Sequence, residues 1–485
     1  MPESGTRHLP ANSTAQASLA PVAASQRIDS MDILRGIALV GILVMNIEWF
    51  GRSISEFSTF DRTLSGMDHA VGWLVRCFVE GKFYKLFALL FGMGFAVMLL
   101  RAQEKGIAFG AWFTRRMLVL FVIGLLHMFF IWPGDILHDY AVAGLLLLGW
   151  FTLLQSSTMR RFNKPNTILR IALIWMAFPI MATAIAGGVV GIRYDDTAMV
   201  TAWEEDQQVA RQVEERMALS RNPDGTIEIN VDDVVALGEK RELTSEERVE
   251  AAVAATVSAR RDREADIARE VATYTEGSYW EATQYRFVES LRGLGDTPIF
   301  ALFVLMPTFL VGYWFVASGV LRKRRENHPI FRAMAIIGLS FGFCLTVSGL
   351  VLLQHPASQA SMFIADTGNT LFFFGQYVLC AGYVGLIILL LDRQRWITFL
   401  NRFAPMGRMA LTNYIMQTTI MALIFHGYAG GLFGTVGRAP QMLIATVILV
   451  FQLYFSAWWL RKYQFGPLEW LWRSLTYQSV QPIRV

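Results

Sequence analysis

The chain has 485 residues, of which 54% are hydrophobic and only 17% carry a charged side chain. This composition excludes a soluble globular protein of this size and is typical of a protein that crosses a membrane many times. The formal net charge of +4 implies no nucleic-acid partner, because Lys and Arg retained beside a membrane produce the same excess.

The first predicted element is a tail, residues 1–26, rich in Ala, Ser and Pro. We expect it to be disordered and not a signal peptide, because it has no apolar core. Ten apolar windows follow, each near the roughly 20 residues that a membrane-spanning helix needs. They cover residues 33–50, 83–101, 113–132, 136–155, 168–192, 298–319, 331–354, 368–391, 409–430 and 440–460.

Two segments depart from this series. Residues 70–81, "AVGWLVRCFVEG", are amphipathic, so we expect them at the membrane interface before the second span. Residues 193–296 are dense in charge, with apolar residues at helical spacing and a turn signal at "RNPDGT". We predict a helical insert there, which is either a solvated spacer or a lid over a binding site.

The remaining domain boundaries follow from this insert. A first transmembrane half covers 27–192, a second half covers 297–461, and residues 462–485 form a C-terminal segment. The predicted fold class is therefore all-α: a polytopic transmembrane helical bundle of about ten spans with a charged helical extracytoplasmic insert.

Lys and Arg indicate the orientation. "MRRFNKPNTILR" follows the fourth window and "LRKRRENHPIFR" follows the sixth, whereas "PGD" and "HPASQASMFIADTG" in the alternate loops are nearly free of basic residues. Under the positive-inside rule, both termini are cytoplasmic and the number of spans is even. The 193–296 insert then lies outside.

The cysteines and short motifs exclude several chemistries. Cys77, Cys344 and Cys380 lie far apart, in or beside apolar windows, and form no CxxC pattern. We interpret them as buried small hydrophobic side chains, and we predict neither a disulfide nor a metal site. The chain has no Walker loop or HExxH motif, so ATP hydrolysis and zinc peptidase chemistry are disfavoured.

Polar side chains inside hydrocarbon are costly, so each is a functional hypothesis. Arg35 opens the first window, and Asn46 lies roughly 16 Å farther along it at 1.5 Å per residue. Most of the other ionisable residues gather toward the predicted outer leaflet, where headgroup-level snorkelling or a backbone hydrogen bond is the alternative explanation. These candidates are Lys82, Lys85, His127, Asp135, Tyr140 and Arg286.

The ninth window adds a second kind of candidate. Asn413 and Gln417 are four residues apart in "MALTNYIMQTTIM", so they share one helix face. They either contact a substrate or form hydrogen bonds between helices.

Five stretches lie in order along nearly the whole chain, apart from the tail and the insert. They are "RIDSMDILRGIALVGILVMNI", "GKFYKLFALLFGMGF", "GLLHMFFIWPGDILHDYA", "MGRMALTNYIMQT" and "FGPLEWLWRSLTY". These stretches resemble the YeiB-like family of bacterial polytopic membrane proteins, and the resemblance implies the bacterial cytoplasmic (inner) membrane.

The first helix of that family is similar to that of the wider group of transmembrane acyltransferases. Many of these have an arginine, ten residues and then a histidine, whereas this chain has Asn46 eleven residues after Arg35. The lysosomal glucosaminide N-acetyltransferases look similar to it at this position. The resemblance implies transfer of an acyl group from a cytoplasmic donor such as acyl-CoA to a periplasmic or lipid acceptor. It implies no covalently bound cofactor.

Because Asn46 replaces the common histidine, acyl transfer needs another base. His127 is the candidate, oriented by Asp135 or Asp139, with Asn46 donating to a developing oxyanion. Arg35 is the candidate for donor phosphates, or else a topology anchor paired with Asp32. Substrate contacts are predicted for Arg35, Lys82, Lys85, Tyr140, Arg286, Asn413 and Gln417.

Two other function classes stay open. A transporter or exporter of a small or lipidic solute would use the same polar residues as a path. A non-catalytic membrane module would use the insert as its docking surface. The apolar outer faces suit either membrane lipids or a second copy of the chain in a homodimer.

Overall fold

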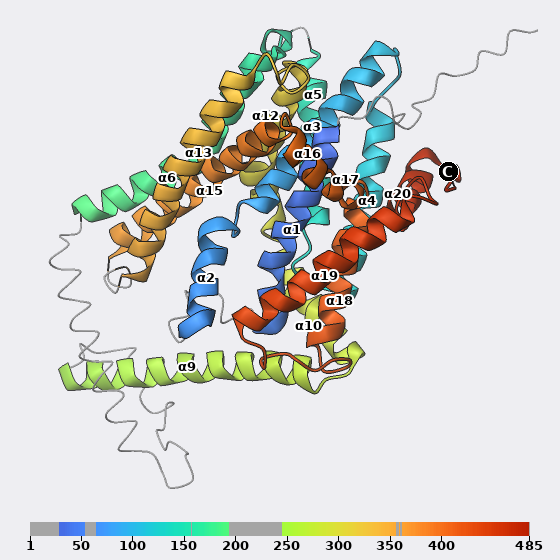
Figure 1. Ribbon diagram of the computed structural model, residues 1–485. Helices are drawn as coiled ribbons and strands as arrows, with labels where there is room; N and C mark the ends of the chain where they lie inside the picture. The colour runs from blue at the N-terminus through green and yellow to red at the C-terminus, as the bar shows by residue number, and fades with distance from the viewer. Residues whose placement is uncertain are drawn as a thin grey trace, which may run out of the picture.

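The computed structural model describes residues 29–53, 65–156, 158–193, 245–355, 358 and 361–484. Within these residues the chain is helical, and its one β-type contact is an isolated bridge between Tyr463 and Arg484. The helices form a single bundle (Figure 1). The predicted all-α polytopic fold is therefore confirmed. The predicted tail, residues 1–26, lies outside the described residues.

Nine helical segments in the described residues are long and apolar enough to cross a membrane. The chain is therefore a multi-pass membrane protein. The segments are α1 (Asp29–Gly51), the joined pair α2 (Gly66–Phe78) and α3 (Phe83–Glu104), α4 (Gly110–Phe130), α5 (Leu137–Leu154), α6 (Pro165–Arg193), α11 to α12 (Thr297–Ala317), α13 (His328–Gln354), α15 (Met362–Leu390) and α19 (Arg438–Trp459).

The ninth predicted window, residues 409–430, contains a shorter apolar helix, α18 (Ala410–Phe425), of 16 residues. At 1.5 Å per residue it covers about 24 Å. It is short because the chain leaves helical geometry at Met409, between α18 and the single turn α17 (Ala404–Arg408). Together with the nine longer segments, α18 places a helix in every predicted apolar window.

Both ends of the transmembrane chain meet at one end of the bundle. Gly407, in the turn before α18, packs against Asp32 O at the start of α1, and Glu469, after α19, accepts a hydrogen bond from Leu411 N at the start of α18. This agrees with an even number of crossings, whereas the cytoplasmic side of that end remains a prediction.

The largest core cluster lies where α3, α4, α5 and α12 meet. Phe95 packs edge-on against Phe113, and Phe91 stacks on Phe309 with ring centroids 4.6 Å apart. In a bilayer such close packing, rather than removal of apolar surface from water, holds neighbouring helices together.

A second layer consists of α13 and α15, which pack against each other along much of their length, with α6 beside α15 (Figure 1). Gly338 and Gly382 allow this approach, because a Cβ atom on Gly338 would collide with the backbone of Gly382. Cys77 and Cys380 are buried as predicted. The prediction for Cys344 was wrong, since it lies on an exposed face of α13.

The described part of the insert is helical, as predicted. It consists of α9 (Ser245–Thr275) and α10 (Tyr279–Gly293), and α9 runs across the end of the bundle (Figure 1). Ser53, after α1, donates a 2.5 Å hydrogen bond to Glu270, and Gly427 N donates to Tyr274 O at 2.7 Å. The insert thus covers the bundle end opposite Arg35. Residues 194–244 lie outside the described residues.

Candidate functional site

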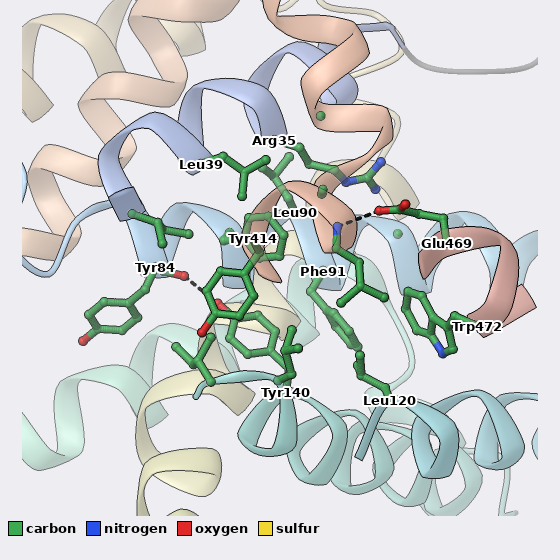
Figure 2. A pocket seen from close by; sticks show the side chains of 18 of the residues that line it. Arg35, Leu39, Tyr84, Leu90, Phe91, Leu120, Tyr140, Tyr414, Glu469 and Trp472 are labelled. Atoms are coloured by element: carbon green, nitrogen blue, oxygen red, sulfur yellow. Dashed lines mark hydrogen bonds between the residues drawn. The ribbon is translucent and has the colours of Figure 1, made fainter. Parts of the chain in front are cut away.

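A cavity of about 460 Å³ runs along one face of α1. The α1 residues that line it recur every three or four positions, as one face of a helix requires. From Asp32 to Trp49 this face covers about 26 Å at 1.5 Å per residue. Figure 2 shows Arg35 and Leu39 on this wall, with Leu90, Phe91 and Leu120 from α3 and α4 beside them.

One end of the cavity is basic. Four arginines line it, and Arg35 forms a 2.8 Å ion pair with Asp32. The Arg116 guanidinium stacks on the Trp472 ring, with its carbon 3.7 Å from the ring centroid. The four are Arg35, Arg116, Arg408 and Arg473. We call this the arginine end.

Helix α20 (Pro467–Tyr477) covers the arginine end and presents Glu469 to the start of α18 (Figure 2). The Glu469 carboxylate accepts hydrogen bonds from Leu411 N at 2.7 Å and Thr412 N at 3.0 Å, and from Thr412 Oγ1 at 2.6 Å. Burial raises the pKa of Glu469, and these hydrogen bonds offset part of that rise. Glu469 thus caps the free N–H groups at the start of α18, where a negative charge also interacts favourably with the helix dipole.

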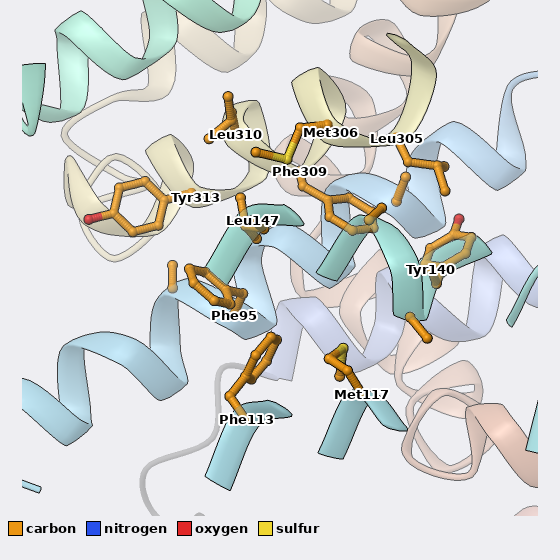
Figure 3. Close-up of a cluster of buried hydrophobic side chains, with 14 of the residues drawn as sticks. Phe95, Phe113, Met117, Tyr140, Leu147, Leu305, Met306, Phe309, Leu310 and Tyr313 are labelled. Atoms are coloured by element: carbon orange, nitrogen blue, oxygen red, sulfur yellow. The ribbon is translucent and has the colours of Figure 1, made fainter. Parts of the chain in front are cut away.

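The opposite end contains Asn46, and we call it the asparagine end. Three tyrosines line the cavity there, and the Tyr140 hydroxyl donates to Tyr84 O at 2.7 Å. The Tyr414 hydroxyl is buried and has no hydrogen-bond partner among the described residues. Tyr140 also belongs to the core cluster, so the cavity wall is packed from behind (Figure 3).

The segment 132–140, which joins α4 to α5 and includes the first turn of α5, has two faces. Gly134, Ile136 and Tyr140 line the cavity, whereas Asp135 and His138 are buried behind that wall. The segment is therefore a thin partition between the cavity and a buried polar cluster.

The predicted pairing of His127 with Asp135 is present in that cluster. His127 Nδ1 lies 2.7 Å from Asp135 Oδ1, and His127 Nε2 lies 2.7 Å from Thr418 Oγ1. The second carboxylate oxygen accepts from His138 N and faces His138 Nδ1, both at 3.0 Å. Burial alone would raise the pKa of Asp135, but the hydrogen bonds to the two histidines are together stronger and lower it.

His127 does not line the cavity. It is 2% exposed, and both ring nitrogens already have partners. The Tyr414 ring lies next to it, with ring centroids 5.2 Å apart, and Tyr414 lines the cavity. Tyr414 thus lies at the boundary between the predicted base and the cavity.

Lys82 and Lys85 lie outside the cavity as well. Lys85 is 1% exposed, and its ammonium donates to Gly81 O at 3.1 Å, to Tyr84 OH at 2.8 Å and to Gln376 Oε1. It also lies 4.5 to 4.7 Å from three ring centroids. These contacts replace water around the cation. Lys82 donates to Arg76 O at 2.6 Å.

Arg286 joins the insert to α4. Its guanidinium donates to Thr283 Oγ1 at 2.8 Å and to Phe130 O, at the end of α4, at 3.2 Å. A cation at a helix C-terminus is favourable, so this geometry gives Arg286 a docking role.

Asn413 and Gln417 connect α18 with α19. Asn413 Nδ2 donates to Ser456 Oγ at 2.9 Å, and Gln417 Nε2 donates to Gln452 Oε1 at 2.8 Å. Neither residue lines the cavity. Of the predicted site residues, the cavity therefore brings together Arg35, Asn46 and Tyr140.

Among the cavity residues that sequence reasoning missed are Arg116, Tyr414, Glu469 and Trp472. Arg116 stands in "TRRM" and the last two in "PLEWLWRSL", where charges beside an apolar run look like ordinary interface anchors. Nothing in the sequence indicates that α20 folds back over the start of α18.

The chain is similar in sequence to proteins of unknown function. Residues 315–479 match the family described as "Protein of unknown function (DUF418)". The chain is 29% identical to "Uncharacterized protein YxaH" of Bacillus subtilis (strain 168), over 96% of this chain and 98% of the relative. It is 25% identical to "Uncharacterized protein YeiB" of Escherichia coli (strain K12), over 94% and 98%. No solved structure matches. These likenesses, two of them over nearly the full length of the chain, support the resemblance to the YeiB-like family.

Proposed function

We propose that this protein transfers an acyl group from a donor at the arginine end of the cavity to an acceptor that enters at the asparagine end. The observation that carries the proposal is the single cavity that joins Arg35 to Asn46 along α1. An enzyme that uses reactants from the two sides of a membrane needs such a continuous path.

The proposed reaction uses groups at both ends of the cavity. The acceptor oxygen or nitrogen forms a bond to the acyl carbon, the bond between that carbon and the donor sulfur breaks, and the acceptor loses its proton. The Asn46 amide and the Tyr414 hydroxyl are donors that can stabilise the oxyanion formed in between. Acyl-CoA fits this scheme as the donor, with its phosphates at the arginines.

His127 is the base in this proposal, as the sequence suggested. Asp135 already holds its Nδ1 atom, which is the arrangement that orients a general base. Because Tyr414 separates the ring from the cavity, the proposal requires Tyr414 to turn aside and the Thr418 contact to open when the acceptor binds.

Thioester cleavage in nanodiscs tests the proposal. Purified protein is supplied with acetyl-CoA and a membrane extract as the source of acceptor, and release of free CoA is followed. His127→Gln should lower turnover by roughly a hundredfold or more. The matched control is His328→Gln, an exposed histidine at the start of α13, which should match the wild type. Equal turnover in both variants would contradict the assignment.

One observation favours a second function, transport of a lipidic solute. Among the described residues that line the asparagine end there is no imidazole and no carboxylate, so the cavity itself holds no base there. In that case proteoliposomes should show flux of a fluorescent lipid without thioester cleavage, and His127→Gln should leave the flux intact.

A further inference from the structure

Arg116 is a cation without an anionic partner. Among the described residues its guanidinium makes no hydrogen bond or ion pair, and its contacts are the Trp472 ring at 3.7 Å and the Trp112 ring at 5.9 Å. It nevertheless lines a membrane-embedded cavity, where an uncompensated charge is costly. A cation in this position is explained if a ligand supplies the missing anion.

The nearby carboxylates are already occupied. Asp32 pairs with Arg35 at 2.8 Å, and both oxygens of Glu469 accept from Leu411 and Thr412. The start of α18, which could otherwise bind an anion, is capped by the same carboxylate. The guanidinium of Arg116 is therefore an open donor group at this end.

Trp472 determines how Arg116 can bind. The indole Nε1 donates to Arg116 O at 2.8 Å, and the ring covers one face of the guanidinium. A guanidinium stacked on a ring keeps its edge N–H groups available, and two parallel N–H groups fit a phosphate or carboxylate in bidentate fashion.

The wall beyond the arginines is hydrocarbon. Between Arg35 and Asn46 the α1 face of the cavity contributes Leu39, Ile42 and Met45, with Leu90 and Leu120 opposite. A ligand held by Arg116 thus extends its other end among apolar side chains, where a polar group without a partner would be penalised.

We infer that Arg116, stacked on Trp472, binds the phosphate group of an elongated amphiphile whose chain lies along α1. This inference rests on the proposed function only in that the cavity receives a ligand. The phosphate can belong to a lipid from the bilayer or to a soluble thioester cofactor, because the group that Arg116 recognises is the same.

Binding to the full chain in detergent distinguishes these sources. Three probes are titrated against intrinsic Trp fluorescence: hexadecyl phosphate, coenzyme A, and uncharged hexadecanol. At least one phosphate probe should bind more tightly than hexadecanol. Arg116→Gln should weaken the binding of that probe by about tenfold or more. The loss should be smaller for Arg116→Lys, which keeps the charge but lacks the paired N–H donors of the guanidinium. Hexadecyl phosphate alone would identify a lipid, and coenzyme A alone a soluble cofactor.

The control is Arg115→Gln. Arg115 is the neighbouring arginine, donates to Thr476 O at 3.1 Å and does not line the cavity. The affinity of Arg115→Gln for the phosphate probe should therefore stay within about twofold of the wild-type affinity. Equal affinity of the wild type and Arg116→Gln, or no preference for either phosphate probe, would overturn the inference. If phosphate binding depends on Arg116 but no thioester is cleaved, the inference about Arg116 stands and only the proposed acyl transfer is rejected.

Discussion

At the scale of single residues, many buried polar side chains in this protein form hydrogen bonds between helices. Lys85, Arg286 and Asn413 each donate a hydrogen bond to a group on another helix. Placing a polar group in hydrocarbon is costly, but the cost is recovered where a neighbouring helix supplies the partner. Burial of a charge therefore does not by itself identify the site, whereas a donor facing a cavity without a partner does.

Glu469 gives the first stability prediction. Glu469→Ala removes the acceptor of Leu411 N and Thr412 N and should destabilise the protein by about 1–2 kcal/mol, the usual value of a helix cap. Glu469→Gln keeps one oxygen and should lose less. The thermal unfolding midpoint in detergent measures both. Glu326→Ala, an exposed residue paired with Lys323, is the control, and an equal loss there would argue against a capping role.

His426 gives a pH prediction. It is 3% exposed and stacks on Tyr274, and burial together with Arg286 lowers its pKa to about 3. An unfolded histidine has a pKa near 6.5, so between these values the unfolded chain binds a proton that the folded chain excludes. The free energy of unfolding therefore falls as the pH drops from about 6.5 toward 3.

His426→Gln removes this contribution. From pH 7.5 to 4.5 the unfolding midpoint of the wild type should fall more than that of the variant, and the gap between them should narrow. Parallel curves would show that protonation of His426 does not oppose folding. Other titrating groups are common to both proteins and cancel in the comparison.

At the scale of elements, small residues determine how closely helices approach. Gly338→Ala places a methyl group against the backbone of Gly382, so α13 and α15 must separate and the unfolding midpoint should fall. Gly149→Ala, in α5 with open space around the new Cβ, is the matched control. It should be neutral or stabilising by up to about 1 kcal/mol, because Ala favours helix over Gly. Equal losses would contradict this explanation.

Elements also show where prediction from sequence succeeded. Ten apolar windows indicated ten helices, because hydropathy over about 20 residues is a strong local signal. The pairing of His127 with Asp135 was also accessible, since only a short turn separates them. The cavity was not, because α17 and α20 reach it through contacts between residues far apart in the chain, such as Thr412 with Glu469.

At the scale of the whole molecule, orientation can be tested directly. The loops at residues 163 and 327 should lie in the cytoplasm with the C-terminus, because they hold the clustered Lys and Arg. Reporter fusions truncated at these residues should be active with a cytoplasmic fluorescent protein. Fusions at 276 and 355 should be active only with a periplasmic phosphatase. The reverse pattern would invert the bundle without changing its fold.

The two-faced segment 132–140 has a mechanical consequence. Gly134 and Ile136 line the cavity, and Asp135 lies between them in the sequence. A ligand that displaces this backbone therefore also shifts the Asp135 carboxylate, which is held between His127 and His138. Occupancy and proton affinity are then thermodynamically linked, and the linkage is reciprocal. A ligand that changes the protonation of this cluster must therefore bind with an affinity that depends on pH.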